Sequence, residues 1–154
     1  MKVGELCSRD VLTMSATEPL AQCARRMKAR NVGSAVIVDD SEGFARPVGI
    51  VTDRDILRGQ FERCADLFCL STGDVMSSDL LVLDEQMDVA EAIGRMSQRS
   101  VRRAPVVSTG GGLTGIVTFD DLLPAIAGQI SAIAALIGGQ SRHRKRHGRS
   151  GEMQ

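Results

Sequence analysis

The heptapeptide Gly-Ile-Val-Thr-Asp-Arg-Asp at residues 49–55 returns as Gly-Ile-Val-Thr-Phe-Asp-Asp at residues 115–121. The similarity continues upstream, because eleven of the 36 positions in 3–38 are identical to those in 72–107 at an offset of 69 residues. The offset falls to 66 at the heptapeptides, so the second copy lacks three residues in the intervening turn. Because self-similarity of this kind marks a repeated structural unit, the chain is predicted to hold two copies of one unit.

Each copy has the same order of hydrophobic patterns. A short extended segment comes first, then an amphipathic helix, two strands joined by a turn, and a second helix that starts after the threonine of the heptapeptide. The apolar faces of the two amphipathic helices are formed by Leu20, Cys23, Ala24 and Met27 in the first copy and by Val89, Ala92, Ile93 and Met96 in the second. Neither copy can cover its own apolar sheet face, so we expect two βαββα units packed together in an α/β (α+β) fold.

Both heptapeptides match the pattern glycine, two apolar residues, threonine or serine, two variable residues and aspartate, and each follows a strand-like segment at 31–38 or 100–107. In these features the chain resembles a pair of CBS domains, also called a Bateman module. The resemblance covers roughly residues 3–128. It implies two βαββα units around a pseudo-twofold axis and a disk-like dimer. It also implies clefts between the units that take AMP, ADP, ATP or S-adenosylmethionine.

The repeat borders divide the chain into four parts. The first repeat is expected at 1–62, with a linker that begins near residue 59, and the second at 72–128. An apolar helix is expected at 125–138, followed by a basic disordered tail at 139–154.

The Thr-x-x-Asp end of each heptapeptide carries the candidate binding chemistry. At a strand-to-helix junction it offers a hydroxyl and a carboxylate beside free backbone N–H groups, and helix N-termini favour phosphate. The resemblance implies that the aspartate holds a ribose, that the threonine lies near phosphate, and that each pair works with the pocket of the other repeat. The preferred cleft then comprises Thr52, Asp55, Leu81, Val101, Arg102 and Arg103. The second cleft comprises Leu12, Val32, Gly33, Thr118 and Asp121.

The two clefts are not expected to be equivalent. In the preferred cleft, Leu81 and Val101 would contact the base, and Arg102 and Arg103 would lie near phosphate. In the second cleft, glycine and serine stand at the positions of these arginines. A phosphate-bearing ligand is therefore expected in the preferred cleft.

A structural interpretation of the same residues stays open. Thr52 with Asp55, and Thr118 with Asp121, also have the spacing of capping boxes, which satisfy free N–H groups at the start of a helix. Two such pairs alone favour a capping role, and the surrounding repeat favours ligand binding. Two alternative functions follow: a dimerising interaction scaffold with vestigial clefts, and a nucleic-acid binder that uses the basic tail.

Composition argues against several classes of function. The 154 residues are 43% hydrophobic and contain no Trp and no Tyr, whereas binding of single-stranded nucleic acid usually relies on aromatic stacking. Residues 142–154 hold five of the 19 basic residues and one of the 19 acidic ones, which leaves 14 basic and 18 acidic residues in 1–141. A mildly acidic body argues against nucleic acid as its partner.

Motifs for catalysis, metals and targeting are missing from the sequence. It has no serine elbow, Walker loop or zinc-protease pair, so no enzyme activity and no required cofactor are expected. Cys64 and Cys69 are spaced too widely for a zinc knuckle, and Cys7 and Cys23 are expected to be ordinary reduced thiols. No signal peptide or apolar stretch of membrane-spanning length is recognised, so a cytoplasmic location is expected.

The segment after the second repeat has a one-sided apolar pattern. Ile126, Ile130, Ile133 and Ile137 recur at helical spacing, so this helix is expected to pack either on its own domain or on a second subunit. The pattern and the family habit together predict a homodimer. The basic run 142–149 is interpreted as a solvated tail, and the regulated partner protein cannot be named from the sequence.

Overall fold

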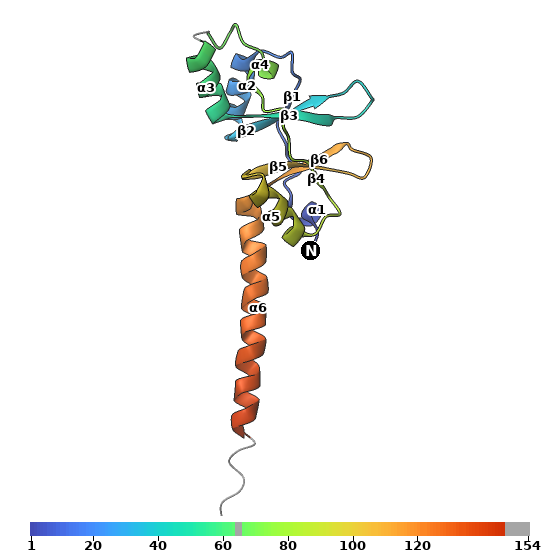
Figure 1. Ribbon diagram of the computed structural model, residues 1–154, viewed down its shortest axis with the longest axis vertical. Coiled ribbons are helices and arrows are strands. Elements are labelled where there is room, and N and C mark those ends of the chain that lie inside the picture. The colour runs from blue at the N-terminus through green and yellow to red at the C-terminus, as the bar shows by residue number, and fades with distance from the viewer. Residues whose placement is uncertain (64–65, 147–154) are drawn as a thin grey trace, which may run out of the picture. The chain divides into compact units, whose positions relative to one another are not determined.

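The computed structural model describes residues 1–63 and 66–146, which form two compact units. The first unit, Met1–Phe119, contains both repeats, and the second begins at Asp120. The mixed α/β fold expected from the sequence is confirmed, with two three-stranded sheets and a helix at the C-terminal end (Figure 1).

The first repeat forms a sheet in the order β1-β2-β3. Its elements are α1 (Val3–Leu6), β1 (Thr13–Met14), α2 (Leu20–Ala29), β2 (Ser34–Asp39), β3 (Arg46–Thr52) and α3 (Asp53–Arg63). The short strand β1 pairs parallel to β2, and β2 and β3 form an antiparallel hairpin. The parallel pairing needs a crossover connection, and α2 provides it.

The second repeat has the same topology, with strand order β4-β5-β6. Its elements are α4 (Thr72–Val75), β4 (Leu83–Asp84), α5 (Val89–Gln98), β5 (Arg103–Val107), β6 (Leu113–Thr118) and α6 (Phe119–Arg146). The two hairpins even share an irregularity, since the register shifts between Ile37 and Val38 and again between Val106 and Val107, 69 residues later. The internal repeat of the sequence is therefore a repeat of structure.

The two repeats exchange their leading segments. Ser8 and Ile116 of β6 donate to each other's carbonyls with N···O distances of 2.9 Å. The equivalent pair, Ser77 and Ile50 of β3, does the same at 3.0 and 3.1 Å. Each leading segment thus pairs with the last strand of the other repeat, and this reciprocal pairing relates the repeats in the pseudo-twofold manner that the resemblance implies.

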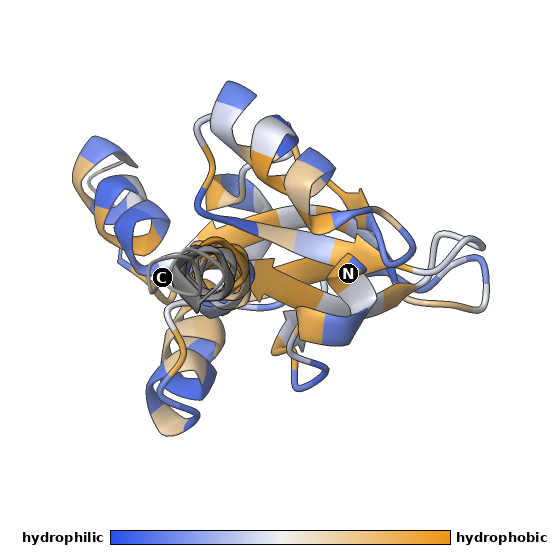
Figure 2. Cartoon of the chain, turned by 90° about the horizontal axis from the view of Figure 1, so that it is seen from below, coloured by the Kyte–Doolittle hydropathy of each residue, from blue (hydrophilic) through white to orange (hydrophobic). Residues whose placement is uncertain are grey.

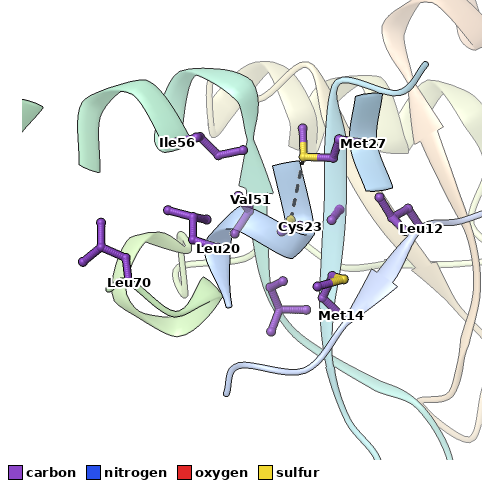
Figure 3. Packing of buried hydrophobic residues seen from close by; sticks show 10 residues of the cluster. Leu12, Met14, Leu20, Cys23, Met27, Val51, Ile56 and Leu70 are labelled. Carbon is purple, nitrogen blue, oxygen red and sulfur yellow. Dashed lines mark hydrogen bonds between the residues drawn. The ribbon is translucent and has the colours of Figure 1, made fainter. Parts of the chain in front are cut away.

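The core of the first repeat lies between its helices and its sheet (Figure 3). Leu20, Cys23 and Met27 of α2 are buried as the helical pattern predicts, and Ala24 is partly buried at the edge. Val51 of β3 is fully buried in the same cluster. Hydrophobic residues likewise concentrate on the strands, and hydrophilic residues on the outer faces of the helices (Figure 2).

The helix α6 differs from the expected boundaries. One continuous helix covers Phe119–Arg146, whereas the sequence predicted a helix at 125–138 and a disordered tail from 139. Residues 139–146 include Gln, Arg and Lys, which are good helix formers, and basic residues are favourable at a helix C-terminus. Residues 147–154 lie outside the described residues.

The same helix corrects a second expectation. By length and composition alone, Phe119–Ile137 could cross a membrane, and few of its side chains are buried. In the sequence, Asp120, Asp121 and Pro124 interrupt the beginning of this segment, and no apolar stretch of that length was therefore expected. Because the helix starts at Phe119, these three residues belong to it and add to the length of the segment that could span a membrane.

Candidate functional site

Thr52 and Asp55 lie at the junction of β3 and α3 and form a capping box. The backbone N–H and the hydroxyl of Thr52 both donate to Asp55 Oδ2, at 2.9 and 2.7 Å, and the Asp55 N–H donates to Thr52 Oγ1 at 3.3 Å. The capping interpretation of the sequence is therefore realised in the structure. It satisfies donors at the start of α3 that the helix itself cannot satisfy.

The Asp55 carboxylate has little remaining capacity for a ligand. It is buried, with 8% of the residue exposed, and its Oδ1 accepts a hydrogen bond from Arg58 Nη2 at 3.1 Å. A carboxylate offers about four lone-pair positions, and three of them are occupied by Thr52 and Arg58. One acceptor position is left for a ligand hydroxyl, and a second becomes available if Arg58 moves away.

A cleft of about 390 Å³ lies beside this cap, within the first unit. It is lined by Ile50, Thr52, Asp53, Arg54, Asp55, Ser77, Asp79, Leu80, Leu81, Val101, Arg102 and Arg103. All six residues of the preferred cleft are among them, so the structure brings together the set chosen from the sequence. Thr52 and Asp55 come from the first repeat and the other four from the second, which is the crossing that the resemblance implies.

The cleft is also lined by residues that the sequence motifs did not indicate. Ile50 and Ser77 belong to the paired segments that join the repeats, and Asp79 and Leu80 follow Ser77 along the chain. Ser77 and Asp79 are identical to Ser8 and Asp10 in the first repeat, and this identity could have marked them as candidate site residues. It does not indicate which of the two clefts they line.

The cleft is electrostatically suited to an anion. Among the described residues, the guanidinium groups of Arg54, Arg102 and Arg103 have no hydrogen-bond or ion-pair partner, whereas two of the three carboxylates are paired. Asp55 pairs with Arg58, and Asp79 pairs with Arg99. Of the carboxylates that line the cleft, Asp53 has no ion pair with another described residue, and its Oδ1 accepts a hydrogen bond from the Arg54 backbone N–H at 2.9 Å.

Gly33 lies beside Arg103, although the sequence assigned it to the second cleft. A Cβ atom at Gly33 would stand 3.4 Å from Arg103 Nη1 and 4.0 Å from Asp53 Oδ2. These are ordinary van der Waals distances, so Gly33 borders the Arg103 guanidinium. Gly33 also accepts a hydrogen bond from the Asp53 N–H at 3.3 Å, which places it next to the preferred cleft.

The other residues of the second cleft belong to different elements and units of the fold. Leu12 is buried in the core of the first repeat, and Val32 packs against that core and lines an apolar hollow of about 370 Å³ between α2 and α3. Thr118 ends β6 in the first unit, and Asp121 belongs to the second unit. The second cleft remains a prediction.

The described cysteines have different environments. Cys23 is fully buried, Cys7 is half-buried and Cys69 is exposed, while Cys64 lies outside the described residues. Burial, with a smaller effect of the Glu18 carboxylate, raises the pKa of the Cys23 thiol to about 11, against a partial opposing effect of Arg26. Within 1–63 and 66–146, no three His, Cys, Asp or Glu side chains are grouped to hold a metal ion.

Comparison with known proteins agrees with the repeat and its fold. The model of the CBS domain family matches residues 3–62 and 73–128. The chain belongs to the CBS-domain family. CBS-domain pairs are typically regulatory modules without catalytic activity of their own.

Two curated relatives show how the pair occurs in other chains. An uncharacterized protein of Methanopyrus kandleri is 36% identical over 80% of this chain, and the match covers 61% of that protein. The inosine-5′-monophosphate dehydrogenase of Thermoplasma acidophilum is 31% identical over 75% of this chain, but the match covers only 21% of the enzyme. The chain thus spans about three fifths of the first relative and one fifth of the second.

A solved CBS domain pair has the same fold. It was crystallised with 5′-methylthioadenosine and S-adenosyl-L-methionine, and it superposes with a TM-score of 0.71 at 22% identity, over 84% of this chain and 98% of its own. At this level of identity the likeness establishes the fold of the pair.

Proposed function

We propose that the chain is a cytoplasmic, non-catalytic regulatory module that binds an adenine nucleotide of the AMP, ADP or ATP class and modulates a partner protein. The observation that carries the proposal is that Arg54, Arg102 and Arg103, which have no ion-pair partner among the described residues, line the same cleft as the Thr52–Asp55 pair. Arginine binds phosphate oxygens through charge-assisted, often bidentate hydrogen bonds.

The rest of the cleft supports a nucleoside attached to that phosphate. Ile50, Leu80, Leu81 and Val101 supply apolar contact area for a base. The remaining acceptor position of Asp55 supplies a partner for a ribose hydroxyl. The volume of about 390 Å³ falls within the range of about 300–1,000 Å³ that is usual for small-molecule sites.

The charge of the cleft favours a phosphate ester over S-adenosylmethionine. S-adenosylmethionine carries a sulfonium cation, which three unpaired guanidinium groups would repel, whereas the phosphates of AMP, ADP or ATP are attracted. A related fold binds S-adenosyl-L-methionine, and this ligand therefore serves as a comparison in the experiment.

The regulatory role follows from the composition of the cleft walls. Because Thr52 and Asp55 come from the first repeat and Arg102 and Arg103 from the second, a nucleotide would contact both repeats at once. A ligand shifts a conformational equilibrium when it binds one arrangement better than another. We propose that the module works in this way as a homodimer, with the partner protein sensing the change.

A thermal-shift series with AMP, ADP, ATP, adenosine and S-adenosylmethionine tests the proposal. A ligand that binds only the native state increases the free energy of unfolding, by about 2.7 kcal/mol at a ligand concentration of 100 Kd, and this raises the melting temperature. We expect the nucleotides to raise it more than adenosine or S-adenosylmethionine. No shift with any nucleotide would contradict the proposal and leave the interaction scaffold as the better function.

A further inference from the structure

The candidate nucleotide cleft is lined by one carboxylate that has no ion pair with a described residue. This carboxylate belongs to Asp53, the first residue of α3, and it shares the cleft with three arginines, Arg54, Arg102 and Arg103. We propose that Asp53 makes the cleft selective for a nucleoside monophosphate over the corresponding diphosphate and triphosphate. The inference rests on the proposed function and deepens it, because it names which phosphate ester the cleft takes.

The Asp53 carboxylate lies near the guanidinium of Arg103. Asp53 Oδ2 and Arg103 Nη1 are 4.0 and 3.4 Å from the same point, the position that a Cβ atom would take on Gly33. The two side chains come from different repeats, since Asp53 begins α3 and Arg103 begins β5. Arg103 is half-buried and has no ion pair with a described residue, so its charge is available to an anion that enters beside Asp53.

Backbone hydrogen bonds hold Asp53 in this place. Its Oδ1 accepts a hydrogen bond from the Arg54 backbone N–H at 2.9 Å, and its own N–H donates to the Gly33 carbonyl at 3.3 Å. Oδ2 accepts no hydrogen bond from any described residue. A phosphate that binds Arg103 therefore comes close to a negative charge that the protein itself does not neutralise.

The unpaired charges of the cleft match a single phosphate group. Asp55 pairs with Arg58 and Asp79 pairs with Arg99, so three guanidinium groups and the Asp53 carboxylate are left, with two positive charges in excess. A phosphate monoester carries about −1.5 to −2 charges at pH 7, so AMP neutralises this excess. No further unpaired cation is available among the described residues that line the cleft for the additional phosphates of ADP or ATP.

The additional phosphates also meet Asp53 at short range. Arg54 follows Asp53 directly in the chain, and Arg103 lies near its Oδ2, so a run of phosphates that reaches both arginines passes the carboxylate. Like charges repel each other, and the repulsion grows with the charge of the ligand. Asp53 therefore lowers the affinity of the cleft for every nucleotide, and it lowers the affinity for ATP most.

An acidic residue at the start of a helix also has a structural effect, because it interacts favourably with the helix dipole. The second repeat has Phe119 at the position equivalent to Asp53, so the helix start of this repeat unit does not require an acid there. A test must still separate stability from selectivity. The ratio of the affinities for AMP and ATP does so, because the same folded protein binds both ligands.

Calorimetric titration of AMP and ATP into the full chain tests the inference, with EDTA present so that no divalent cation neutralises the triphosphate. We expect the wild type to bind AMP more tightly than ATP. Asp53→Asn is expected to bind both more tightly and to gain more for ATP, so that the ratio of AMP to ATP affinity falls roughly 3- to 10-fold. Asp53→Glu keeps the charge and is expected to keep the ratio. Asp40→Asn is the matched control, because Asp40 is exposed and does not line the cleft.

The outcomes separate this inference from the proposed function. Tighter binding of ATP than of AMP by the wild type would overturn the inference alone, as would equal changes of both affinities in Asp53→Asn. Absence of any binding of AMP, ATP or adenosine to the wild type would contradict the proposed function and the inference together. Thermal unfolding without ligand shows whether each variant is folded, and Asp53→Ser, which removes the same charge, replaces Asp53→Asn if the latter does not fold.

Discussion

The hydroxyl of Thr52 donates to Asp55 Oδ2 at 2.7 Å while Arg58 donates to Oδ1 of the same carboxylate at 3.1 Å. The carboxylate that is proposed to recognise a ribose thus already caps α3 and holds an arginine. A nucleotide therefore has to use the one remaining acceptor position or displace Arg58, and the two tasks of Asp55 can be separated by substitution.

Asp55→Ala is expected to lower both stability and AMP affinity, whereas Asp55→Asn is expected to lower mainly affinity. Removal of the cap costs about 0.5–2 kcal/mol, and an asparagine side chain keeps an acceptor oxygen for Thr52. Thermal unfolding and calorimetric titration measure the two effects separately. If the Asp55→Asn variant binds AMP as tightly as the wild type, the carboxylate serves only as a helix cap.

Arg102→Ala/Arg103→Ala is expected to weaken AMP binding more than adenosine binding. A hydrogen bond to a charged group contributes about 1.5–3 kcal/mol, so loss of phosphate contacts reduces AMP affinity by roughly 10- to 100-fold, and adenosine has no phosphate to lose. Calorimetric titration gives both affinities. Arg95→Ala is the control, because Arg95 pairs with Glu91 on the surface of α5 and does not line the cleft. Equal losses for the two ligands would remove the phosphate role from Arg102 and Arg103.

Gly115→Ala is expected to destabilise the fold more than Gly49→Ala, although the two glycines are equivalent in the repeat. A Cβ at Gly115 would stand 2.8 Å from the backbone oxygen of Ser8, which is held by the exchanged leading segment. At Gly49 the nearest obstacle is Met76 Sδ at 2.5 Å, the mobile part of a flexible side chain.

The control for the glycine pair is Gly94→Ala. Apart from the neighbouring residues and the backbone of α5 itself, no described atom lies within 4 Å of a Cβ at Gly94, so this change is expected to stabilise the helix by about 0.5–1 kcal/mol. Denaturant unfolding of all three variants checks the order. A smaller loss of stability for Gly115→Ala than for Gly49→Ala would contradict the rigidity of the Ser8 pairing.

Cys23 is expected to resist thiol reagents that modify Cys69 rapidly. Only the thiolate is nucleophilic, and burial raises the pKa of Cys23 to about 11 from 9.0, while Cys69 is exposed. Peptide mapping after iodoacetamide treatment at pH 8 follows each site. Rapid labelling of Cys23 in the native protein would show that the core around α2 opens readily.

The same pKa predicts a change of stability at high pH. Between about pH 9 and 11 the unfolded thiol ionises while the folded thiol stays protonated, so the folded state binds more protons than the unfolded state. The free energy of unfolding should therefore fall as the pH rises through this window. Cys23→Ala leaves a cavity but removes this part of the pH dependence, and an unchanged slope in that variant would contradict the assignment.

The sequence by itself determined the repeat and the order of elements in each repeat, and six of the twelve residues that line the cleft were chosen from it. The repeat and the element order could be predicted because they rest on local information: alternation and helical spacing of apolar residues, and a heptapeptide that places Thr52 and Asp55 at a strand-to-helix junction. The elements of the second repeat could then be predicted from those of the first, because identical positions such as Val32 and Val101 imply the same element in both copies.

Only the tertiary structure decided which partners these residues have. Arg58 pairs with Asp55 and Arg99 pairs with Asp79, whereas Arg54, Arg102 and Arg103 have no ion pair with any described residue, and the sequence does not show which of these charges come within reach of each other. Gly33 lies against Arg103 for the same reason. Helix α6 continues through Gly138 and Gly139 to Arg146, although glycine is the residue that most often follows a helix end, so the hydrophobic period alone did not place the end of this helix.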